Sequence, residues 1–308
     1  MKENSDSIEN IYQSLRPQLI AICFRMLGSL AEAEEIVQDS FVEFQKADRS
    51  EIKSAKAWLI RVCSNKAINL LKSAYKNRES YTGPWLPDEI PEGLAPWHER
   101  ESASSQEHKI ILAESLTTSF LLILETLTPE QRAVYLLNEI FDYSFKEVAD
   151  FLNKEVAACR KIGQRARDAI EKKKRRFSDP PTEARETILK LYEFATNGDR
   201  EGIKSILSDE CELWGDGGGK VFSSGLVTDL ESAIDFFEKL GASEAFQSNK
   251  YRLVFSQVNS RPGVVVSRKT DSEKWIIDTV ISYEFDQDQI VRVYVQRNPD
   301  KLSSLLNA

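Results

Sequence analysis

Helix-type and strand-type patterns occupy different parts of this chain, and this division limits its fold more than any other feature. Apolar residues recur at helical spacing from residue 8 to about residue 176. After Asp179-Pro180-Pro181, helical stretches at 184–196 and 200–207 lead into short strand-like runs, which one helix at 230–240 interrupts. Helices first and a mostly antiparallel meander afterwards predict all-α domains followed by a separate α+β domain.

A proline-rich, acidic segment divides the helical part. Residues 79–109 contain four prolines, with six acids between residues 79 and 101, and this composition disfavours both helix and sheet. We therefore expect domains at 8–78, 110–178 and 183–308, with 79–109 as a linker. Strands are expected at 211–214, 251–258, 263–268, 274–284 and 289–296.

Composition excludes several classes of protein. The 308 residues contain no apolar run near the roughly 18 residues that span a bilayer, and the first ten residues lack the apolar core of a signal peptide. The four cysteines are scattered without a C-x-x-C pair, which argues against a zinc site or a disulfide framework. We expect a cytoplasmic protein with reduced, mostly buried thiols and no metal or cofactor.

The net charge of −8 conceals blocks of opposite sign. Residues 26–45 carry five acids and no base, whereas 52–78 carry seven bases and no acid. Residues 154–176 carry ten bases against three acids. Such blocks suggest surfaces with different partners, although each could also be a solvated helix face.

The acid-free block predicts a nucleic-acid surface. At about 100° per residue, one helix face collects the polar residues Arg61, Asn65, Asn69 and Lys72. Lysine and arginine neutralise phosphates, and asparagine can discriminate bases. The preceding loop, residues 45–54, could hold an unstacked base.

The second basic block follows a helix-turn-helix pattern. Thr128 begins one helix, Ser144 caps a second, and Asn153 can adopt the left-handed turn that ends it. A longer basic helix begins near Glu155. Its exposed polar residues suit major-groove recognition: Arg160, Lys161, Gln164, Arg165 and Arg167. The run 172–176, KKKRR, could hold phosphates or counter the helix dipole.

Two stretches resemble the bacterial extracytoplasmic-function sigma factors. LGSLAEAEEIVQDSFVEF with AWLIRVCSNKAINLLK resembles their second region, and residues 127–170 resemble their fourth region. The resemblance implies that Glu34, Glu35 and Asp39 bind the clamp helices of core RNA polymerase. It also implies that Asn65, Asn69 and the 45–54 loop read the −10 element, and that the basic helix reads the −35 element.

Three short motifs narrow the resemblance to the group of these sigma factors with a fused SnoaL-like domain, a cone-shaped α+β fold. The motifs are Trp85-Leu86-Pro87, Asp216-Gly217-Gly218-Gly219-Lys220 and Asn298-Pro299-Asp300-Lys301-Leu302. The resemblance implies that this last domain contacts the sigma core and regulates it. One departure is Asn153, where glycine is common in the family.

The glycines have a physical reading of their own. Three successive glycines after Asp216 allow a close approach of another chain segment, and Lys220 could then reach an acidic partner. A plain hairpin turn is the alternative. We prefer a contact with the sigma core or the linker.

An enzymatic role for the last domain is disfavoured. It lacks histidine and a metal-ligand cluster, leaving Asp216, Asp278, Tyr283 and Tyr294 as possible polar groups in a pocket. A small ligand in the cone is more plausible, because cone folds often keep a cavity. For the whole chain, the alternative to a sigma factor is a ligand-responsive helix-turn-helix regulator that binds duplex DNA without polymerase.

Overall fold

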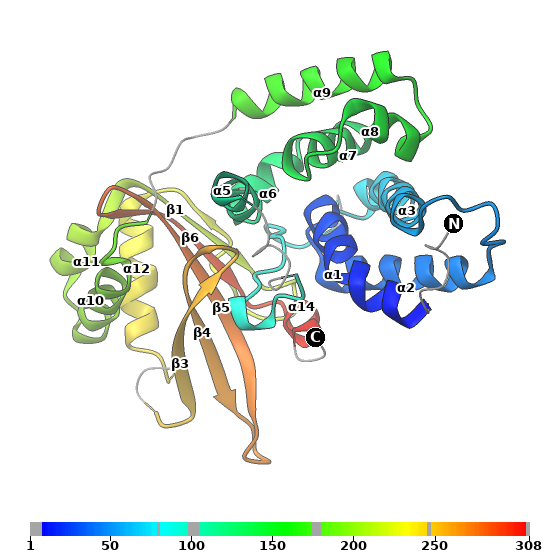
Figure 1. Ribbon diagram of the computed structural model, residues 1–308. Coiled ribbons are helices and arrows are strands. Elements are labelled where there is room, and N and C mark those ends of the chain that lie inside the picture. The colour runs from blue at the N-terminus through cyan, green and yellow to red at the C-terminus, as the bar shows by residue number, and fades with distance from the viewer. Residues whose placement is uncertain (1–7, 79–80, 98–104, 174–179, 245–247, 306–308) are drawn as a thin grey trace. The chain divides into compact units, whose positions relative to one another are not determined.

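The computed structural model describes residues 8–78, 81–97, 105–173, 180–244 and 248–305. They form two compact units (Figure 1). The first unit contains the described residues up to 78 and those from 96 to 173. The second contains residues 81–95 and the described residues from 180 onward. The first half of the predicted linker therefore belongs with the last domain.

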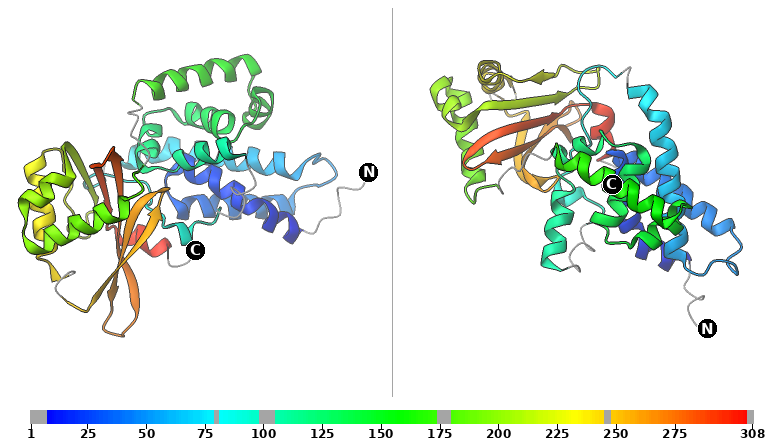
Figure 2. Two further views of the ribbon diagram at one scale, coloured as in Figure 1. Left: turned by 60° about the vertical axis from the view of Figure 1, so that its left-hand side comes forward. Right: turned by 90° about the horizontal axis from the view of Figure 1, so that it is seen from above.

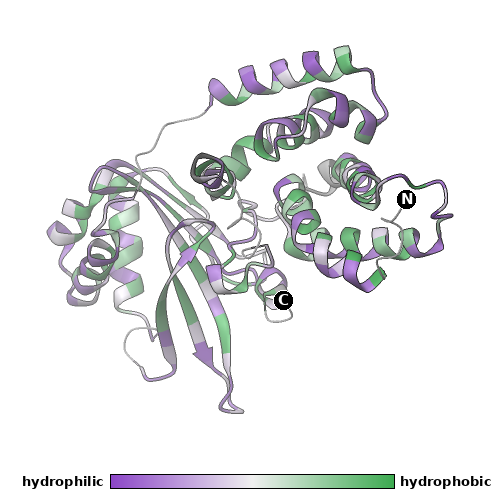
Figure 3. Ribbon diagram, viewed as in Figure 1, coloured by the Kyte–Doolittle hydropathy of each residue, from purple (hydrophilic) through white to green (hydrophobic). Residues whose placement is uncertain are grey.

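The first unit is entirely helical. Its N-terminal part contains α1 (Ile8–Leu27), α2 (Leu30–Lys46) and α3 (Ala55–Arg78). Its later part contains α5 (Gln106–Glu114), α6 (Thr118–Leu124), α7 (Pro129–Tyr135), the π-helical turn η2 (Leu136–Ile140), α8 (Phe145–Leu152) and α9 (Val156–Glu171). The helices carry hydrophobic residues mainly on one side (Figure 3), so burial of that side explains their association.

Local capping explains where the helices of the helix-turn-helix begin and end. The Thr128 side chain accepts from the Gln131 N–H and the Ser144 side chain from the Glu147 N–H, and each makes a complete capping box. Asn153 ends α8 with φ 50° and ψ 52°. Asparagine tolerates this left-handed conformation better than other residues with a Cβ. The turn therefore forms although this chain has asparagine where glycine is common.

Buried arginines join the early and late helices of this unit. The Arg25 Nε donates to Ser115 Oγ at 2.8 Å, and its Nη2 donates to the Leu112 carbonyl at 3.1 Å. Arg132 donates to the Met26 carbonyl at 2.6 Å from a side chain that is only 1% exposed. Because unpaired buried donors are costly, these bonds fix the packing of α1 against the later helices.

The second unit is built on one six-stranded sheet. Its strands are β1 (Leu207–Asp216), β2 (Leu226–Val227), β3 (Tyr251–Val258), β4 (Arg261–Lys269), β5 (Trp275–Asp286) and β6 (Gln289–Gln296). The strand order is β2-β1-β6-β5-β4-β3, with β1 and β6 parallel and every other pair antiparallel. The parallel pair follows from a crossover rather than a hairpin.

Three helices cover one face of this sheet (Figures 1 and 2). They are α10 (Ala184–Asn197), α11 (Arg200–Ile206) and α12 (Leu230–Gly241). Their apolar sides and alternate strand residues, such as Tyr283 and Val293, form the core. The short helices η1 (Glu92–Leu94) and α14 (Pro299–Ser304) lie on the other side of the sheet (Figure 1).

The predicted order of structural classes is confirmed: the helical part, with its helix-turn-helix, precedes an α+β domain built on one sheet. Several boundaries differ. Helix α5 begins at Gln106, inside the predicted linker, because Ser105 caps it. Strand β1 starts at Leu207 rather than Cys211, since its pairing with β6 extends to Ile290. The π-helical turn and the short β2 and α14 were not predicted.

The left-handed residue in the turn gives a direct test. Asn153→Ala is expected to lower the free energy of unfolding by about 1 kcal/mol, because alanine pays the full steric cost of this conformation. Asn153→Gly should change it by less than about 0.5 kcal/mol. Urea denaturation followed by circular dichroism measures both. Lys154→Ala, at the exposed neighbouring position, is the control. Equal losses for the alanine and glycine variants would contradict the assignment.

Candidate nucleic-acid interfaces and linker clasp

Helix α9 presents a basic face to solvent. Cys159, Gly163 and Ala166 are on its buried side. A Cβ at Gly163 would lie 3.0 Å from the Phe145 ring, so glycine lets α9 pack closely on α8. Four of the predicted −35 residues are exposed together on the opposite side: Arg160, Lys161, Gln164 and Arg165.

Two other predicted groups on α9 are placed differently. The Arg167 Nε lies 3.3 Å from the Glu139 carboxylate, and both side chains are about one-third exposed. Arg167 therefore supports η2 rather than extending the exposed face. Only Lys172 and Lys173 of the 172–176 run lie within the described residues.

The polar face of α3 is partly used within the first unit. Arg61 and Asn69 are exposed. The Asn65 side chain instead donates to the Phe151 carbonyl of α8 at 3.1 Å and to the Arg61 carbonyl at 2.7 Å. An asparagine predicted to read DNA therefore binds the backbone of the helix-turn-helix.

Lys72 makes the second such contact. Its ammonium lies 2.6 Å from the Glu130 carboxylate of α7. This hydrogen bond lowers the pKa of Glu130. The pair thus contributes at neutral pH and is lost as the pH falls through that lowered pKa. The face of α3 expected to bind DNA is in contact with α7 and α8 at two polar positions.

A hollow of about 360 Å³ lies beside these contacts. Residues 51–54 and the first turns of α3 form one side, including Trp58 and Arg61. Glu147, Asp150 and Phe151 of α8 form the other. The hollow borders the loop expected to hold an unstacked base, but its α8 side carries two acids.

The acids of α2 are divided between internal pairs and solvent. Glu34 lies 2.6 Å from Arg16. Asp39 is 3.6 Å from Lys66, which is closer to Glu43 at 2.8 Å. Glu35 is exposed. Glu35 and Asp39 are therefore the more accessible of the three predicted polymerase-binding acids.

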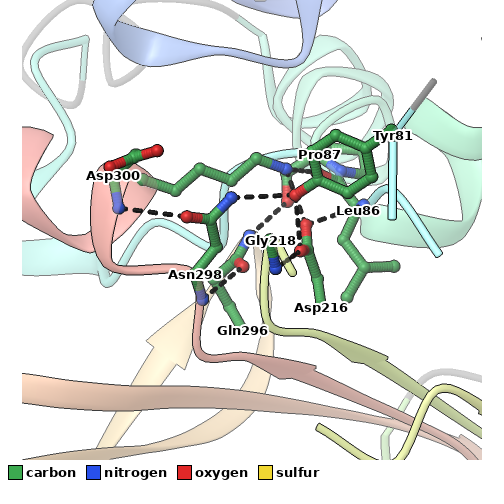
Figure 4. A network of polar contacts seen from close by, with 9 residues as sticks. Tyr81, Leu86, Pro87, Asp216, Gly218, Gln296, Asn298 and Asp300 are labelled. Carbon is green, nitrogen blue, oxygen red and sulfur yellow. Dashed lines mark hydrogen bonds and ion pairs between the residues drawn. The ribbon is translucent and has the colours of Figure 1, made fainter. Parts of the chain in front are cut away.

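The three short motifs meet in the second unit, at a cluster that we call the linker clasp: Tyr81, Trp85, Leu86, Asp216, Asn298 and Lys301. Its centre is the Asp216 carboxylate, whose side chain is fully buried. This carboxylate accepts from the Tyr81 hydroxyl at 2.6 Å and from the Leu86 N–H at 3.2 Å (Figure 4). It also accepts from the Gly218 N–H at 2.9 Å.

Lys301 completes the clasp. Its ammonium lies 2.8 Å from the Asp216 carboxylate and donates to the Leu86 carbonyl. The same ammonium sits 4.6 Å from the centre of the Trp85 ring, within the range of a cation–π interaction. One lysine thus contacts both the linker and β1.

The glycines make room for neighbouring segments. A Cβ at Gly218, where φ is +62°, would lie 2.5 Å from the Asn298 side chain. A Cβ at Gly219, where φ is +68°, would lie 2.9 Å from Thr82 of the linker. These contacts require glycine sterically. Lys220 is exposed and pairs with Asp300 at 2.6 Å.

Two residues of this region, Tyr81 and Asn259, were not predicted, whereas Asn298, Pro299 and Leu302 belong to a predicted motif. Asn298 donates to the Tyr81 hydroxyl at 2.8 Å. Asn259, in the turn between β3 and β4, donates to the Asp88 carbonyl and accepts from the Ile90 N–H. Its role in holding the linker has no local signal in the sequence, because its partners lie 169 and 171 residues away. Pro299 begins α14, and Leu302 is buried.

Burial and the Asp216 carboxylate raise the pKa of Tyr81 well above its usual range. The hydroxyl therefore remains protonated at neutral pH and can donate to Asp216. Pro87 contributes through its carbonyl, which accepts from Gln296 at 3.5 Å. Residues 81–91 are thus fixed by backbone and side-chain bonds to β1, β6 and the β3–β4 turn.

The cone contains a cavity of about 400 Å³ between α12 and the sheet. Of the polar groups suggested for a pocket, only Asp278 lines it. Tyr283 is buried behind it and bonds to the Tyr192 hydroxyl at 2.6 Å, Tyr294 is buried without lining the cavity, and Asp216 belongs to the clasp. Among the described residues there is no cluster of histidine, cysteine or acids that could hold a metal.

Two parts of the helical unit match known sequence families. Residues 11–77 match Sigma-70 region 2, and residues 118–170 match Sigma-70, region 4. The ECF RNA polymerase sigma factor SigJ of Mycobacterium tuberculosis is 32% identical over 210 residues, which cover 68% of this chain and 65% of SigJ. The chain belongs to the extracytoplasmic-function (ECF) sigma factors.

Two further comparisons define the extent of this similarity. The ECF RNA polymerase sigma factor SigW of Bacillus subtilis is 25% identical over 178 residues, or 56% of this chain and 92% of SigW. The crystal structure of SigJ superposes with a TM-score of 0.68 at 22% identity and covers 96% of this ECF sigma factor. That match extends the common fold through the cone. No helix among the described residues is long and apolar enough to cross a membrane.

The Lys72–Glu130 pair predicts a gain of function in this ECF sigma factor. Glu130→Gln should increase affinity for a single-stranded DNA oligonucleotide about two- to threefold, because Lys72 no longer has a carboxylate competing with phosphate. Fluorescence anisotropy at low salt measures this. Glu186→Gln makes the same charge change at an exposed site on α10, and an equal gain there would show that only net charge matters.

The clasp predicts a difference between two acids that each pair with a lysine. Asp216→Asn should lower the free energy of unfolding by about 3 kcal/mol, because it leaves a largely buried ammonium without its counter-charge. Asp300→Asn should cost less than about 1 kcal/mol, because the Lys220–Asp300 pair is exposed. Thermal unfolding of the full chain compares them. Similar melting temperatures for the two variants would argue against the clasp as a stabilising contact.

Proposed function

We propose that this chain is an alternative sigma factor that directs core RNA polymerase to specific promoters and starts transcription. The match to sigma regions 2 and 4 in order, with a helix-turn-helix bearing an exposed basic face, supports this proposal. Arg160, Lys161, Gln164 and Arg165 would read the −35 element. Arg61 and Asn69, with Asn65 and Lys72 once they leave α7 and α8, would contact the −10 element.

Glu35 and Asp39 would bind the polymerase clamp, with Glu34 a weaker candidate because Arg16 already neutralises it. The alternative, a helix-turn-helix regulator acting without polymerase, leaves the region 2 match and the acidic side of α2 without a role. It is therefore not favoured. Partners beyond polymerase and promoter DNA are not needed for this activity.

The cone would control this activity through the linker. The observation that carries this proposal is the clasp. The segment joining the two sigma regions is bound to the cone through the Tyr81 hydroxyl and the Leu86 N–H, which both donate to Asp216, and through the Leu86 carbonyl, which accepts from Lys301. Lys301 also forms an ion pair with the buried Asp216. A linker bound in this way cannot adopt a different path through polymerase while the clasp is closed. Opening or closing the clasp would therefore change promoter activity.

Run-off transcription with purified core polymerase tests both parts. The full chain is expected to initiate in a core-dependent manner, and Arg165→Ala should reduce initiation at least about tenfold by removing a base contact. Leu189→Ala, at an exposed site on α10, serves as the control. No core-dependent initiation would reject the sigma proposal.

Control by the clasp predicts that Asp216→Asn changes the rate of initiation at least about threefold, as expected when a contact worth more than about 1 kcal/mol is lost. Asp300→Asn should leave the rate near that of the parent chain. A chain ending near Pro180 should change in the same direction as Asp216→Asn. Unchanged transcription from Asp216→Asn and from the shortened chain would reject regulation by the cone while leaving the sigma activity intact.

A further inference from the structure

The cone cavity is placed to bind a small molecule. It encloses about 400 Å³, a volume typical of small-molecule sites. Most of its lining is aromatic or aliphatic, with Tyr192, Phe236 and Tyr251 contributing rings and Val266, Ile281 and Val295 aliphatic groups. The charged residues of the lining are Asp235, Lys239, Asp278 and Arg297. The lining therefore suits a mostly apolar body with a polar end.

The charges around this polar end favour an anion. Asp278 is shared by two cations, with Arg268 at 3.4 Å and Arg297 at 3.6 Å. Lys239 is exposed and has no ion pair among the described residues. The other acid of the lining, Asp235, is bound by Arg200 at 2.7 Å. Both acids of the lining are thus already paired with arginines, whereas the Lys239 ammonium is available to an anion.

Arg297 connects this cavity to the clasp. Its Nη1 donates to the Phe222 carbonyl at 2.9 Å, on the loop that follows the three glycines. Its backbone N–H donates to the Asp216 carbonyl at 2.8 Å. The next residue, Asn298, bonds to the Tyr81 hydroxyl. A ligand that changes the bonds of Arg297 therefore acts one residue away from the linker contacts.

A carboxylate would compete for the groups that hold the loop. Arginine binds carboxylates through two parallel N–H bonds, and here those donors are used on the Phe222 carbonyl and on Asp278. Phe222 is 84% exposed, and its carbonyl accepts from Arg297. A carboxylate bound to Arg297 would compete for this bond, in the loop whose Gly218 and Gly219 pack against Asn298 and Thr82.

We propose that the cone binds a small carboxylate with a mostly apolar body, whose carboxylate contacts Arg297 and Lys239, and that binding loosens the clasp. This inference rests on the proposed control of activity by the clasp and names the chemistry of its effector. In this proposal the cavity detects the carboxylate, and Arg297 couples its binding to the contacts between the cone and the linker.

The test uses the full chain labelled with fluorotryptophan, so that the Trp85 resonance, assigned with Trp85→Phe, reports the clasp. The probes are 3-phenylpropanoate, indole-3-acetate and octanoate, each beside its neutral amide. At least one carboxylate should bind with a Kd of about 1 mM or tighter and shift the Trp85 resonance. Its amide should bind at least about tenfold more weakly.

Variants locate the site. Arg297→Gln should weaken binding of the carboxylate at least about tenfold and remove the Trp85 shift, and Lys239→Gln should weaken binding by a smaller factor. Arg252→Gln, an exposed cation on β3 that does not line the cavity, should bind as the parent does. Failure of all three carboxylates to bind, equal binding of acid and amide, or binding without a Trp85 shift would overturn the proposal.

The two proposals fail separately. If the carboxylates do not bind but Asp216→Asn still alters transcription, control by the clasp stands and its effector is not a carboxylate in this cavity. If a carboxylate binds and shifts Trp85 but Asp216→Asn leaves transcription unchanged, the site is real and the clasp does not control initiation.

Discussion

The ion pair between Asp216 and Lys301 is the interaction on which the path of the linker depends. A buried carboxylate is tolerated only when it is paired and its oxygens accept hydrogen bonds, and Asp216 meets this condition with donors from three other segments. Two of these donors come from the linker. The linker therefore supplies part of the hydrogen bonding that stabilises the buried Asp216 carboxylate. The three glycines after Asp216 allow this close approach, because a Cβ at any of them would clash with a neighbouring segment.

In the first unit, polar side chains on the proposed DNA-binding face also make internal contacts. The α3 face best suited to DNA already bonds to α7 and α8 through Asn65 and Lys72. Buried Arg25 and Arg132 also join the early helices of this unit to the later ones. Breaking these bonds would cost more free energy, because it would leave buried donors unpaired. In the proposed function, promoter binding and internal packing compete for the Asn65 and Lys72 side chains, and separation of α3 from α7 and α8 would expose both of them.

The sequence predicts those features whose causes are local. The helix-turn-helix follows from the Ser144 and Thr128 caps and from the tolerance of Asn153 for a left-handed turn, all within a few residues of the elements they shape. The motifs of the clasp are identifiable by resemblance. The bonds of Tyr81 and Arg297 are not, because their partners lie 135 residues away for Tyr81 and 75 residues away for Arg297. The parallel pairing of β1 with β6 is likewise set by tertiary contacts.

The separation of the clasp partners along the chain has a consequence for the time course of synthesis. Leu86 is made 215 residues before the lysine that binds its carbonyl, an interval of roughly 10 to 40 s at bacterial elongation rates. Region 4 is completed within this interval, by residue 170, while the linker still has no complete cone to bind. Each new molecule of this sigma factor therefore passes through a stage in which its linker is unrestrained, and the proposed regulation by the cone begins only after that stage.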